Sequence, residues 1–208
     1  MLILDRSFGD FRKDKKKLAK FLSTSEENII ILEQIHEDKI FYADKPASGE
    51  IAGHDAAITD KKGIFLLVQI ADCQAVSIKD TKLNVIANIH NGWRGSAKNI
   101  VGKTIREMAK KFGSNPADLH VTISPSLGPC CSKFSDPHNE LPEHLHKYIL
   151  KNNHVDFWKA TFDQCLSEGV LRRNINTNGT CTVCSSDKYF SYRADKGDTG
   201  RNAVVIWI

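Results

Sequence analysis

Three side chains in this sequence have the chemistry of zinc ligands. His36 ends the stretch NIIILEQIH, Cys73 ends GIFLLVQIADC, and His90 ends NVIANIH. Neutral imidazole and thiolate bind zinc well, and three protein ligands with a fourth position open are typical of a catalytic zinc site. The three residues are separated by 37 and then 17 positions, which matches no compact zinc-finger motif. The fold would therefore have to bring them together.

Strands are the elements expected to do so. Continuous apolar runs predict strands near residues 28–36 and over 64–70, and apolar residues alternate with others over 83–89. Each candidate ligand lies at or just past the end of one of these strands. A sheet that gathers those ends would cluster the three ligands.

The turn HNGWRG after the third strand contains a second candidate, Arg94. Its two glycines let the backbone approach a ligand closely, and the N-terminus of a following helix favours anions. A helix over residues 97–112 is predicted from apolar positions at helical spacing, namely Ala97, Ile100, Val101, Ile105, Met108 and Phe112. We expect Arg94 to bind a phosphate or a substrate oxyanion through its planar guanidinium, with a structural salt bridge as the alternative.

The same residues permit a second chemistry. Cys73 would be a nucleophile, His90 its general base, and Asp72 or another polar group would orient the imidazole. In a third interpretation, these cysteine and histidine side chains are simply packed in the core.

Four further cysteines form two local pairs, Cys130 with Cys131 and Cys181 with Cys184, while Cys165 lies on an amphipathic helix and is expected in the core. A structural zinc site on the four thiols is an alternative. Adjacent cysteines are unusual in such sites, which supply ligands about 2–4 residues apart. We therefore expect Cys130 and Cys131 to be reduced and to support the active site without binding a second metal.

Composition indicates an ordinary globular domain. The 208 residues are 41% hydrophobic and 26% charged with a net charge of +4, and the basic run RKDKKK is most simply a solvated helix face over residues 14–22. This argues against nucleic-acid binding, and no apolar run reaches the length of a membrane span. Because no secretory segment is recognised, we expect a cytoplasmic protein without a disulfide framework.

The elements predict an α+β fold in a single domain, with mixed β-sheets flanked by helices. Strands and helices interleave without regular alternation, which argues against a doubly wound parallel sheet. Another helix is expected from residue 157, with Asp156 as its N-cap and Gly169 as its stop. The closing runs YFSYRAD and NAVVIWI suggest a hairpin that completes a sheet.

Read together and in order, six stretches resemble the motifs of the laccase-domain family, also named multicopper polyphenol oxidase, purine nucleoside phosphorylase or peptidoglycan editing factor. They are QIH, ADC, HNGWRG, SLGPCC, DFWKATFDQCLSEGV and YFSYRADKGDTGRNAVVIW, and they span roughly residues 30–208. The resemblance implies one catalytic domain over residues 1–208, similar to the cysteine hydrolase-like fold and with an N-terminal segment shorter than usual in the family. We expect a monomer or small homo-oligomer.

The resemblance implies a zinc ion held by His36, Cys73 and His90, phosphorolysis of purine nucleosides, and deamination of adenosine. Small molecules, a purine nucleoside and phosphate, would be its partners. Copper is the alternative metal, but copper-dependent polyphenol oxidation ranks lower because a multicopper enzyme needs paired histidine clusters and the eight histidines here are scattered. An amidase-like hydrolase of cell-wall precursors and a cysteine-nucleophile hydrolase are further alternatives.

Roles for other residues follow from the same motifs. Arg193 and Arg201 are expected to contact substrate together with Arg94, and Asp72, next to Cys73, to act as a general acid or base or else to cap a turn. The sequence departs from the family pattern at several positions, including Glu37 in place of Gly and Asn91 in place of Ala.

Overall fold

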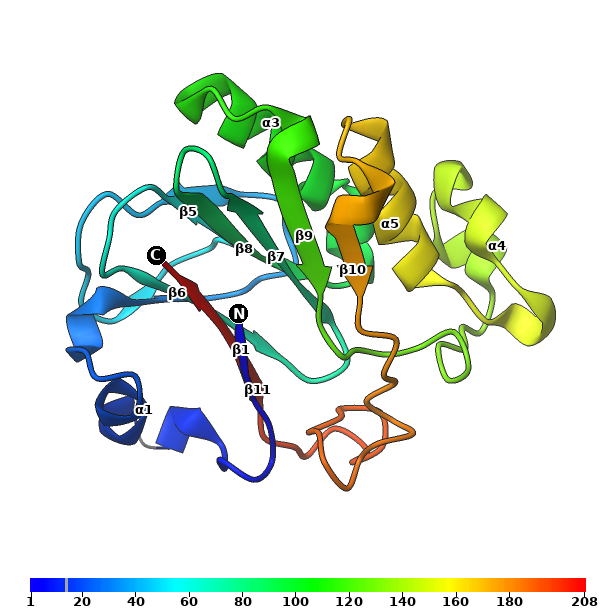
Figure 1. The fold of residues 1–208 in the computed structure, drawn as a ribbon. Coiled ribbons are helices and arrows are strands. Elements are labelled where there is room, and N and C mark those ends of the chain that lie inside the picture. The colour runs from blue at the N-terminus through cyan, green and yellow to red at the C-terminus, as the bar shows by residue number, and fades with distance from the viewer. Residues whose placement is uncertain (14) are drawn as a thin grey trace.

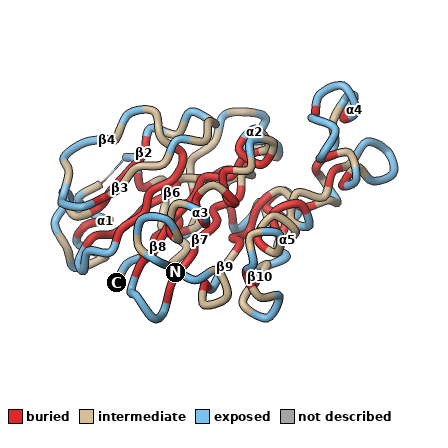
Figure 2. Tube along the Cα trace, turned by 90° about the horizontal axis from the view of Figure 1, so that it is seen from above, coloured by how far each residue is buried: buried red, intermediate tan, exposed pale blue. Residues whose placement is uncertain are grey.

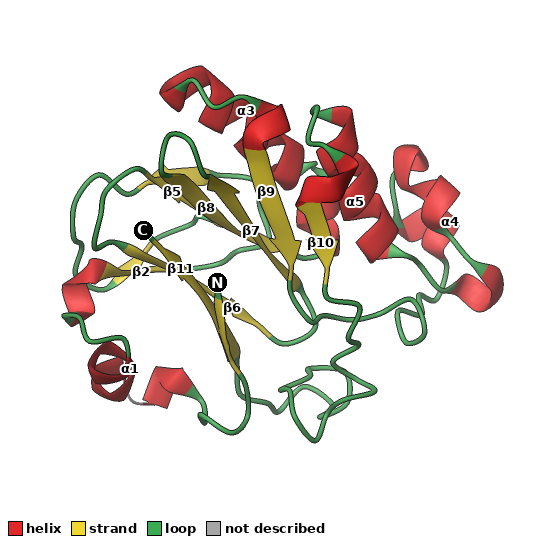
Figure 3. Ribbon diagram, in the orientation of Figure 1, coloured by secondary structure: helices red, strands yellow, loops and turns green. Residues whose placement is uncertain are grey.

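The structure, a computed structural model, describes residues 1–13 and 15–208 and consists of two β-sheets that lie face to face between helices (Figures 1 and 3). The first sheet has the strand order β1-β11-β6-β2-β4 and the second the order β10-β9-β7-β8-β5-β3. Both sheets contain parallel and antiparallel pairs. The predicted α+β class with mixed sheets is confirmed.

The strands have the following bounds. The first sheet comprises β1 (Leu2–Leu4), β2 (Ile29–Leu32), β4 (Glu50–Ile51), β6 (Phe65–Ile70) and β11 (Asn202–Trp207). The second comprises β3 (Ile40–Tyr42), β5 (Ala56–Thr59), β7 (Gln74–Asp80), β8 (Val85–Asn91), β9 (Leu119–Ile123) and β10 (Ile175–Thr177).

The α-helices are α1 (Lys15–Phe21), α2 (Trp93–Ala97), α3 (Ile100–Phe112), α4 (Pro137–Glu140) and α5 (Phe157–Ser167). Short 3-10 helices lie at Phe11–Lys13, Glu26–Asn28, Pro116–Asp118, Glu143–Tyr148, Lys151–Asn153 and Arg172–Asn174. The side chain of Asp156 caps α5 by accepting a hydrogen bond from the Lys159 N–H, as predicted, and Gly169 follows the helix with a φ of 91°. None of the helices in the described part of the chain is long and apolar enough to cross a lipid bilayer.

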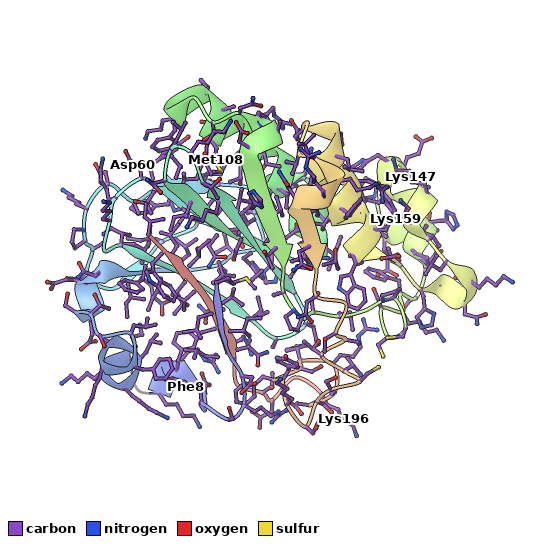
Figure 4. All side chains as sticks on the ribbon, viewed as in Figure 1. Phe8, Asp60, Met108, Lys147, Lys159 and Lys196 are labelled. Carbon is purple, nitrogen blue, oxygen red and sulfur yellow. The ribbon has the colours of Figure 1, made fainter. Side chains whose placement is uncertain are left out.

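The sheets share one core and each covers a second core with its outer face. Buried residues run along the strands of both sheets (Figure 2). Along β2, Ile30 and Leu32 face the other sheet, whereas Ile29 and Ile31 face α1. Burial on both faces explains why this strand is a continuous apolar run. Helices α3 and α5 cover the outer face of the second sheet, where Met108 of α3 is buried (Figure 4).

The order and direction of the strands bring the C-terminal ends of β2, β6 and β8 close together. Strands β2 and β6 are parallel neighbours, so the chain leaves both at the same edge of the first sheet. After β6 the chain crosses directly into β7 of the second sheet through Ala71, Asp72 and Cys73. Because β7 and β8 are antiparallel, the start of β7 lies beside the end of β8, where Ala75 pairs with His90.

Two local predictions need correction. The helix predicted over residues 97–112 is divided into α2 and α3, because Asn99 adopts a left-handed φ of 54° and caps α3 by accepting a hydrogen bond from the Gly102 N–H. The helix expected over 14–22 corresponds to α1, while Asp14 itself lies outside the described residues.

The predicted C-terminal hairpin is also wrong. Strand β11 pairs instead with β1 and β6, and the YFSYRAD segment forms turns in which the Tyr189 N–H donates to the Ser185 carbonyl at 2.9 Å. The Asn202 side chain bonds both backbone groups of Phe190, at 3.0 and 2.9 Å. One side-chain amide therefore replaces the backbone ladder of a hairpin.

Candidate active site

His36, Cys73 and His90 meet at the edge where the chain crosses between the sheets. Their ligand atoms all lie within 4.8 Å of one another, and Cys73 Sγ is 4.0 Å from His36 Nε2. The two imidazole rings meet edge to face with centroids 4.7 Å apart. The structure thus brings together the three residues predicted as zinc ligands, in an arrangement compatible with metal binding.

A buried carboxylate, Asp55, joins two of these residues and was not predicted from the sequence. One of its oxygens lies 2.7 Å from His90 Nδ1, and its carboxylate also accepts hydrogen bonds from the backbone N–H groups of Ile35, His36 and Glu37 at 3.2, 2.9 and 2.8 Å. Because Nδ1 of His90 is engaged, Nε2 remains for a metal. A carboxylate behind a histidine ligand is the usual second partner of such sites. In the sequence, the signal was a single acidic residue directly before the buried strand AAIT.

The electrostatics of the cluster favour a charged pair. Burial raises the pKa of the Cys73 thiol, but the charge of His90 and a hydrogen bond with His36 outweigh it and lower this pKa to about 6. Burial lowers the pKa of His90, but the Cys73 charge and the Asp55 hydrogen bond raise it to about 9. The thiolate, which is the form of cysteine that binds metals and attacks electrophiles, is therefore favoured at neutral pH.

Backbone geometry around the cluster is tight. His36 and Asp72 both have left-handed φ angles, 62° and 88°, which non-glycine residues seldom adopt. A Cβ atom on Gly92 would lie 3.0 Å from Cys73 Sγ and 3.1 Å from His36 Cδ2. Only glycine leaves the space next to the two side chains free, which explains the first glycine of HNGWRG.

Asp72 lies on the crossing between β6 and β7, and both of its carboxylate oxygens have partners. Oδ1 accepts from Thr182 Oγ1 at 2.6 Å and Oδ2 accepts from the Arg193 N–H at 2.7 Å. The Asp72 carbonyl also accepts from the Leu127 N–H at 2.8 Å. These contacts favour the turn-capping interpretation over proton transfer, and they tie two distant loops to the residue preceding Cys73.

The three arginines differ in how they are held. The Arg94 guanidinium stacks on the Trp93 ring at 4.2 Å from its centroid and has no ion pair within residues 1–13 and 15–208. The structure therefore does not support the alternative in which Arg94 forms a structural salt bridge. Arg193 Nη1 donates to the carbonyls of Cys131 and Lys133 at 2.8 and 2.9 Å, and Arg201 Nη1 donates to the Thr199 and Gly200 carbonyls at 3.2 and 3.0 Å.

One pocket of about 830 Å³ contains all the predicted site residues. It is lined by Arg12, Gln34, His36, Gln69, Ile70, Ala71, Asp72, Cys73, Gln74, His90, Asn91, Gly92, Trp93, Arg94, Leu127, Lys133, Phe134, Ser135, Glu140, Phe157, Tyr192, Arg193 and Arg201. The lining includes five arginine or lysine residues against two acidic ones, and four aromatic rings. Its size and character suit a small anionic molecule that carries a flat ring.

The sequence is similar to those of known proteins. Residues 9–208 match the family described as multi-copper polyphenol oxidoreductase laccase. A purine nucleoside phosphorylase of Clostridium acetobutylicum is 38% identical over 175 residues, covering 82% of this chain and 72% of that protein. A purine nucleoside phosphorylase of Corynebacterium glutamicum is 31% identical over 202 residues, covering 94% and 80%.

Solved structures show the same fold. The crystal structure of YlmD from Geobacillus stearothermophilus has a TM-score of 0.86 and 28% identity, covering 96% of this chain and 82% of that one. The Bacillus licheniformis protein YfiH also has a TM-score of 0.86, with 26% identity and coverage of 94% and 80%. The family match begins at residue 9, ahead of the motifs that start near residue 30. The chain therefore belongs to the multi-copper polyphenol oxidoreductase laccase family, whose members similar to it include proteins named purine nucleoside phosphorylase.

Proposed function

We propose that this chain is a zinc-dependent purine nucleoside phosphorylase that also deaminates adenosine. The names of its relatives support the first activity. The observation that carries the proposal is that a cluster of two imidazoles and a thiolate opens into the same pocket as an arginine without an ion pair in the described structure. Metal ligands and an anion-binding group thus face one substrate.

His36, Cys73 and His90 would hold the zinc ion. The donor set fits, because two nitrogens and one thiolate leave a fourth position open, Asp55 orients His90, and Gly92 leaves room beside the ligands. Bound zinc would supply a Lewis acid in the pocket that these residues line. Copper is a weaker candidate, since the chain provides one such cluster of histidine and cysteine rather than paired histidine clusters within the described residues.

In phosphorolysis, a phosphate oxygen attacks C1′ of the ribose, the C1′–N9 bond breaks, and the purine leaves with the bonding electrons and takes up a proton. Arg94 would bind the attacking phosphate, with Arg201 and Arg193 as further contacts, because guanidinium groups make bidentate hydrogen bonds to phosphate. Trp93 and Phe134, whose rings meet edge to face at 6.1 Å, would pack against the purine. Asp72 would position the loop that presents Cys73.

In deamination, water adds to C6 of adenosine and ammonia leaves, which yields inosine. The same pocket would serve both reactions if the nucleoside turns its base toward the cluster in one and its ribose in the other. Separate dependence on phosphate would distinguish the two reactions.

A hydrolase with Cys73 as nucleophile is the second candidate, and one observation favours it. Cys73, His90 and Asp55 stand in the order of a nucleophile, base and orienting carboxylate, with 2.7 Å between the last two. An amidase acting on cell-wall precursors would use this arrangement. Asp55 rather than Asp72 would then be the orienting group.

The test is product analysis with zinc-loaded protein. Inosine should be consumed only with phosphate, giving hypoxanthine and ribose 1-phosphate, whereas adenosine without phosphate should give inosine and ammonia. Cys73→Ala should abolish both reactions, and Cys165→Ala, a core cysteine outside the pocket, should leave them unchanged. If neither nucleoside is consumed by zinc-loaded wild-type protein, the proposal is wrong. Amide hydrolysis that survives a chelator and is lost on alkylation of Cys73 would establish the hydrolase instead.

A further inference from the structure

A second group of ligand atoms lies outside the candidate active site. The Sγ atoms of Cys130, Cys131, Cys181 and Cys184 are all within 4.8 Å of one another. Cys184 Sγ lies 3.6 Å from Cys130 Sγ and 3.5 Å from Cys131 Sγ. In a tetrahedral site with Zn–S bonds of about 2.3 Å, neighbouring sulfurs are about 3.8 Å apart. Two of the sulfur–sulfur distances are therefore already close to those of a zinc tetrathiolate, and all of them are short enough for the four sulfurs to converge on one ion.

We propose that these four cysteines bind a second, structural zinc ion. The ion would join the loop that contains Cys130 and Cys131 to the loop that contains Cys181 and Cys184. This goes beyond the proposed function, because a shell of four protein ligands has no open position for a substrate.

The second loop has the local form expected of a zinc-binding pair. Cys181 and Cys184 have the C-x-x-C spacing, and the Ser185 N–H donates to the Cys181 carbonyl at 3.0 Å, which closes a turn. The Gly128 N–H donates to Cys181 Sγ at 3.3 Å. Such backbone donors stabilise a thiolate and orient a sulfur ligand.

A tight turn brings the sulfurs of the adjacent residues Cys130 and Cys131 close to the second pair of cysteines. The N–H groups of Cys131 and Ser132 both donate to the Gly128 carbonyl at 3.0 Å, so the chain curls around Gly128. Both neighbouring sulfurs consequently reach Cys184. Gly128 itself is pressed between side chains, since a Cβ there would be 2.8 Å from Trp158 and 3.0 Å from Cys181 Cβ.

Apolar packing and disulfide bonding fit the four-cysteine cluster less well than a metal does. Packing of apolar thiols does not account for it, because Cys130 and Cys184 are exposed. A disulfide does not either, since all four cysteines are free and the sulfurs of Cys131 and Cys184 are 3.5 Å apart, compared with about 2.05 Å in a disulfide. Coordination explains both the exposure and the spacing.

Hydrogen bonds connect the loops of the four-cysteine cluster to the pocket. Arg193 donates to the carbonyls of Cys131 and Lys133, and Thr182, between the second pair of cysteines, donates to Asp72. Lys133, Asp72 and Arg193 all line the pocket. A zinc ion on the four thiols would thus hold together two loops that make hydrogen bonds to these pocket residues.

Counting zinc ions in the purified full-length chain by native mass spectrometry tests the proposal. We expect two ions per chain in the wild type, one in Cys184→Ser, one in Cys73→Ala and none when both changes are combined. Cys165→Ala, in which a cysteine outside both clusters is removed, should keep two. None of these counts depends on turnover, so loss of the proposed enzymatic activity would not affect them.

A cobalt experiment decides the matter if Cys184→Ser does not fold. Cys73→Ala loaded with cobalt(II) should show the intense near-ultraviolet charge-transfer bands of a tetrathiolate, because the four remaining ligands are all sulfurs. Cobalt-loaded Cys73→Ala without such bands would overturn the proposal. A wild-type count of one zinc that is kept in Cys184→Ser and lost in Cys73→Ala would do the same, as would a disulfide within the cluster in the native protein.

Discussion

The carboxylate of Asp55 connects the histidine on one strand to the loop that carries the other histidine. It lies 2.7 Å from His90 Nδ1 and 2.9 Å from the backbone nitrogen of His36. One buried side chain therefore fixes the ring orientation of one expected ligand and the backbone of another, and holds His36 at its left-handed φ of 62°.

Asp55→Asn should weaken zinc binding by about 10–100-fold, the usual effect of changing a group that orients a histidine ligand. The amide has one acceptor oxygen, so it cannot accept all four of the present hydrogen bonds. Competition with a zinc-binding indicator measures the change. Asp163→Asn, at a partly exposed carboxylate of α5 outside the pocket, should bind zinc like the wild type, and unchanged affinity in Asp55→Asn would refute the role given to Asp55.

Gly92→Ala should reduce zinc binding while leaving the fold intact. The new methyl group would press on Cys73 Sγ and His36 Cδ2 at 3.0 and 3.1 Å, and overpacking of this kind costs about 1–3 kcal/mol. Zinc titration with circular dichroism measures both properties. Gly49→Ala, where a Cβ meets nothing within 4 Å but φ is 79°, is the control for general backbone strain: it should lower stability and keep zinc affinity. Full zinc affinity in Gly92→Ala would show that the ligands do not need this space.

Arg94→Ala should keep zinc and fold but lower kcat/KM for phosphorolysis by roughly 100–1000-fold, or about 2.7–4 kcal/mol, as when one donor to a developing negative charge is removed. His90→Ala should instead lose zinc and most activity, because a ligand is gone. Arg106→Ala, an exposed arginine on α3 outside the pocket, is the matched control. If Arg94→Ala unfolds the protein but leaves turnover per folded molecule unchanged, Arg94 is structural.

The pH dependence of stability can be tested at Asp195. Its hydrogen bond from Thr199 and the nearby charge of Arg6 hold its pKa below the ordinary value of 3.8. A lowered carboxyl pKa contributes stability above the unfolded-state pKa, and this contribution disappears as the pH falls through the lower folded-state pKa.

Asp195→Asn should therefore reduce the free energy of unfolding at pH 7 by at most about 1 kcal/mol, since the ion pair is partly exposed. The difference from wild type should shrink as the pH is lowered below 3.8. Urea denaturation at several pH values measures it, with the exposed Asp44→Asn as the control. An equal loss at every pH would show that charge is not the cause.

Much of the site could be predicted from the sequence because its residues lie at or near the ends of strands. The apolar patterns that define β2, β6 and β8 end shortly before His36, Cys73 and His90, so these three ligand-type side chains could be recognised from the local sequence. Asp55 did not, since its importance depends on contacts with residues 18 to 35 positions away.

The sequence pattern misled where side-chain contacts, and not regular backbone pairing, determine the local structure. The YFSYRAD segment alternates like a strand, but Asn202 supplies its pairing and the segment turns. The expectation that Cys130 and Cys131 bind no second metal stays a prediction, but the turn around Gly128 brings both of their sulfurs close to Cys184, which the sequence did not indicate. Neither feature has a sequence period that could reveal it.

The crossing of the chain between the two sheets has a thermodynamic consequence. His36 lies on the connection from β2 to β3, Cys73 on the connection from β6 to β7, and His90 within β8, so the ligand set belongs to neither sheet alone. An ion bound there at a free concentration 100 times its dissociation constant would add about 2.7 kcal/mol to the native state. Separating the two sheets at the metal site would release the ion and remove this stabilisation. Metal binding would therefore make the two sheets unfold as one cooperative unit.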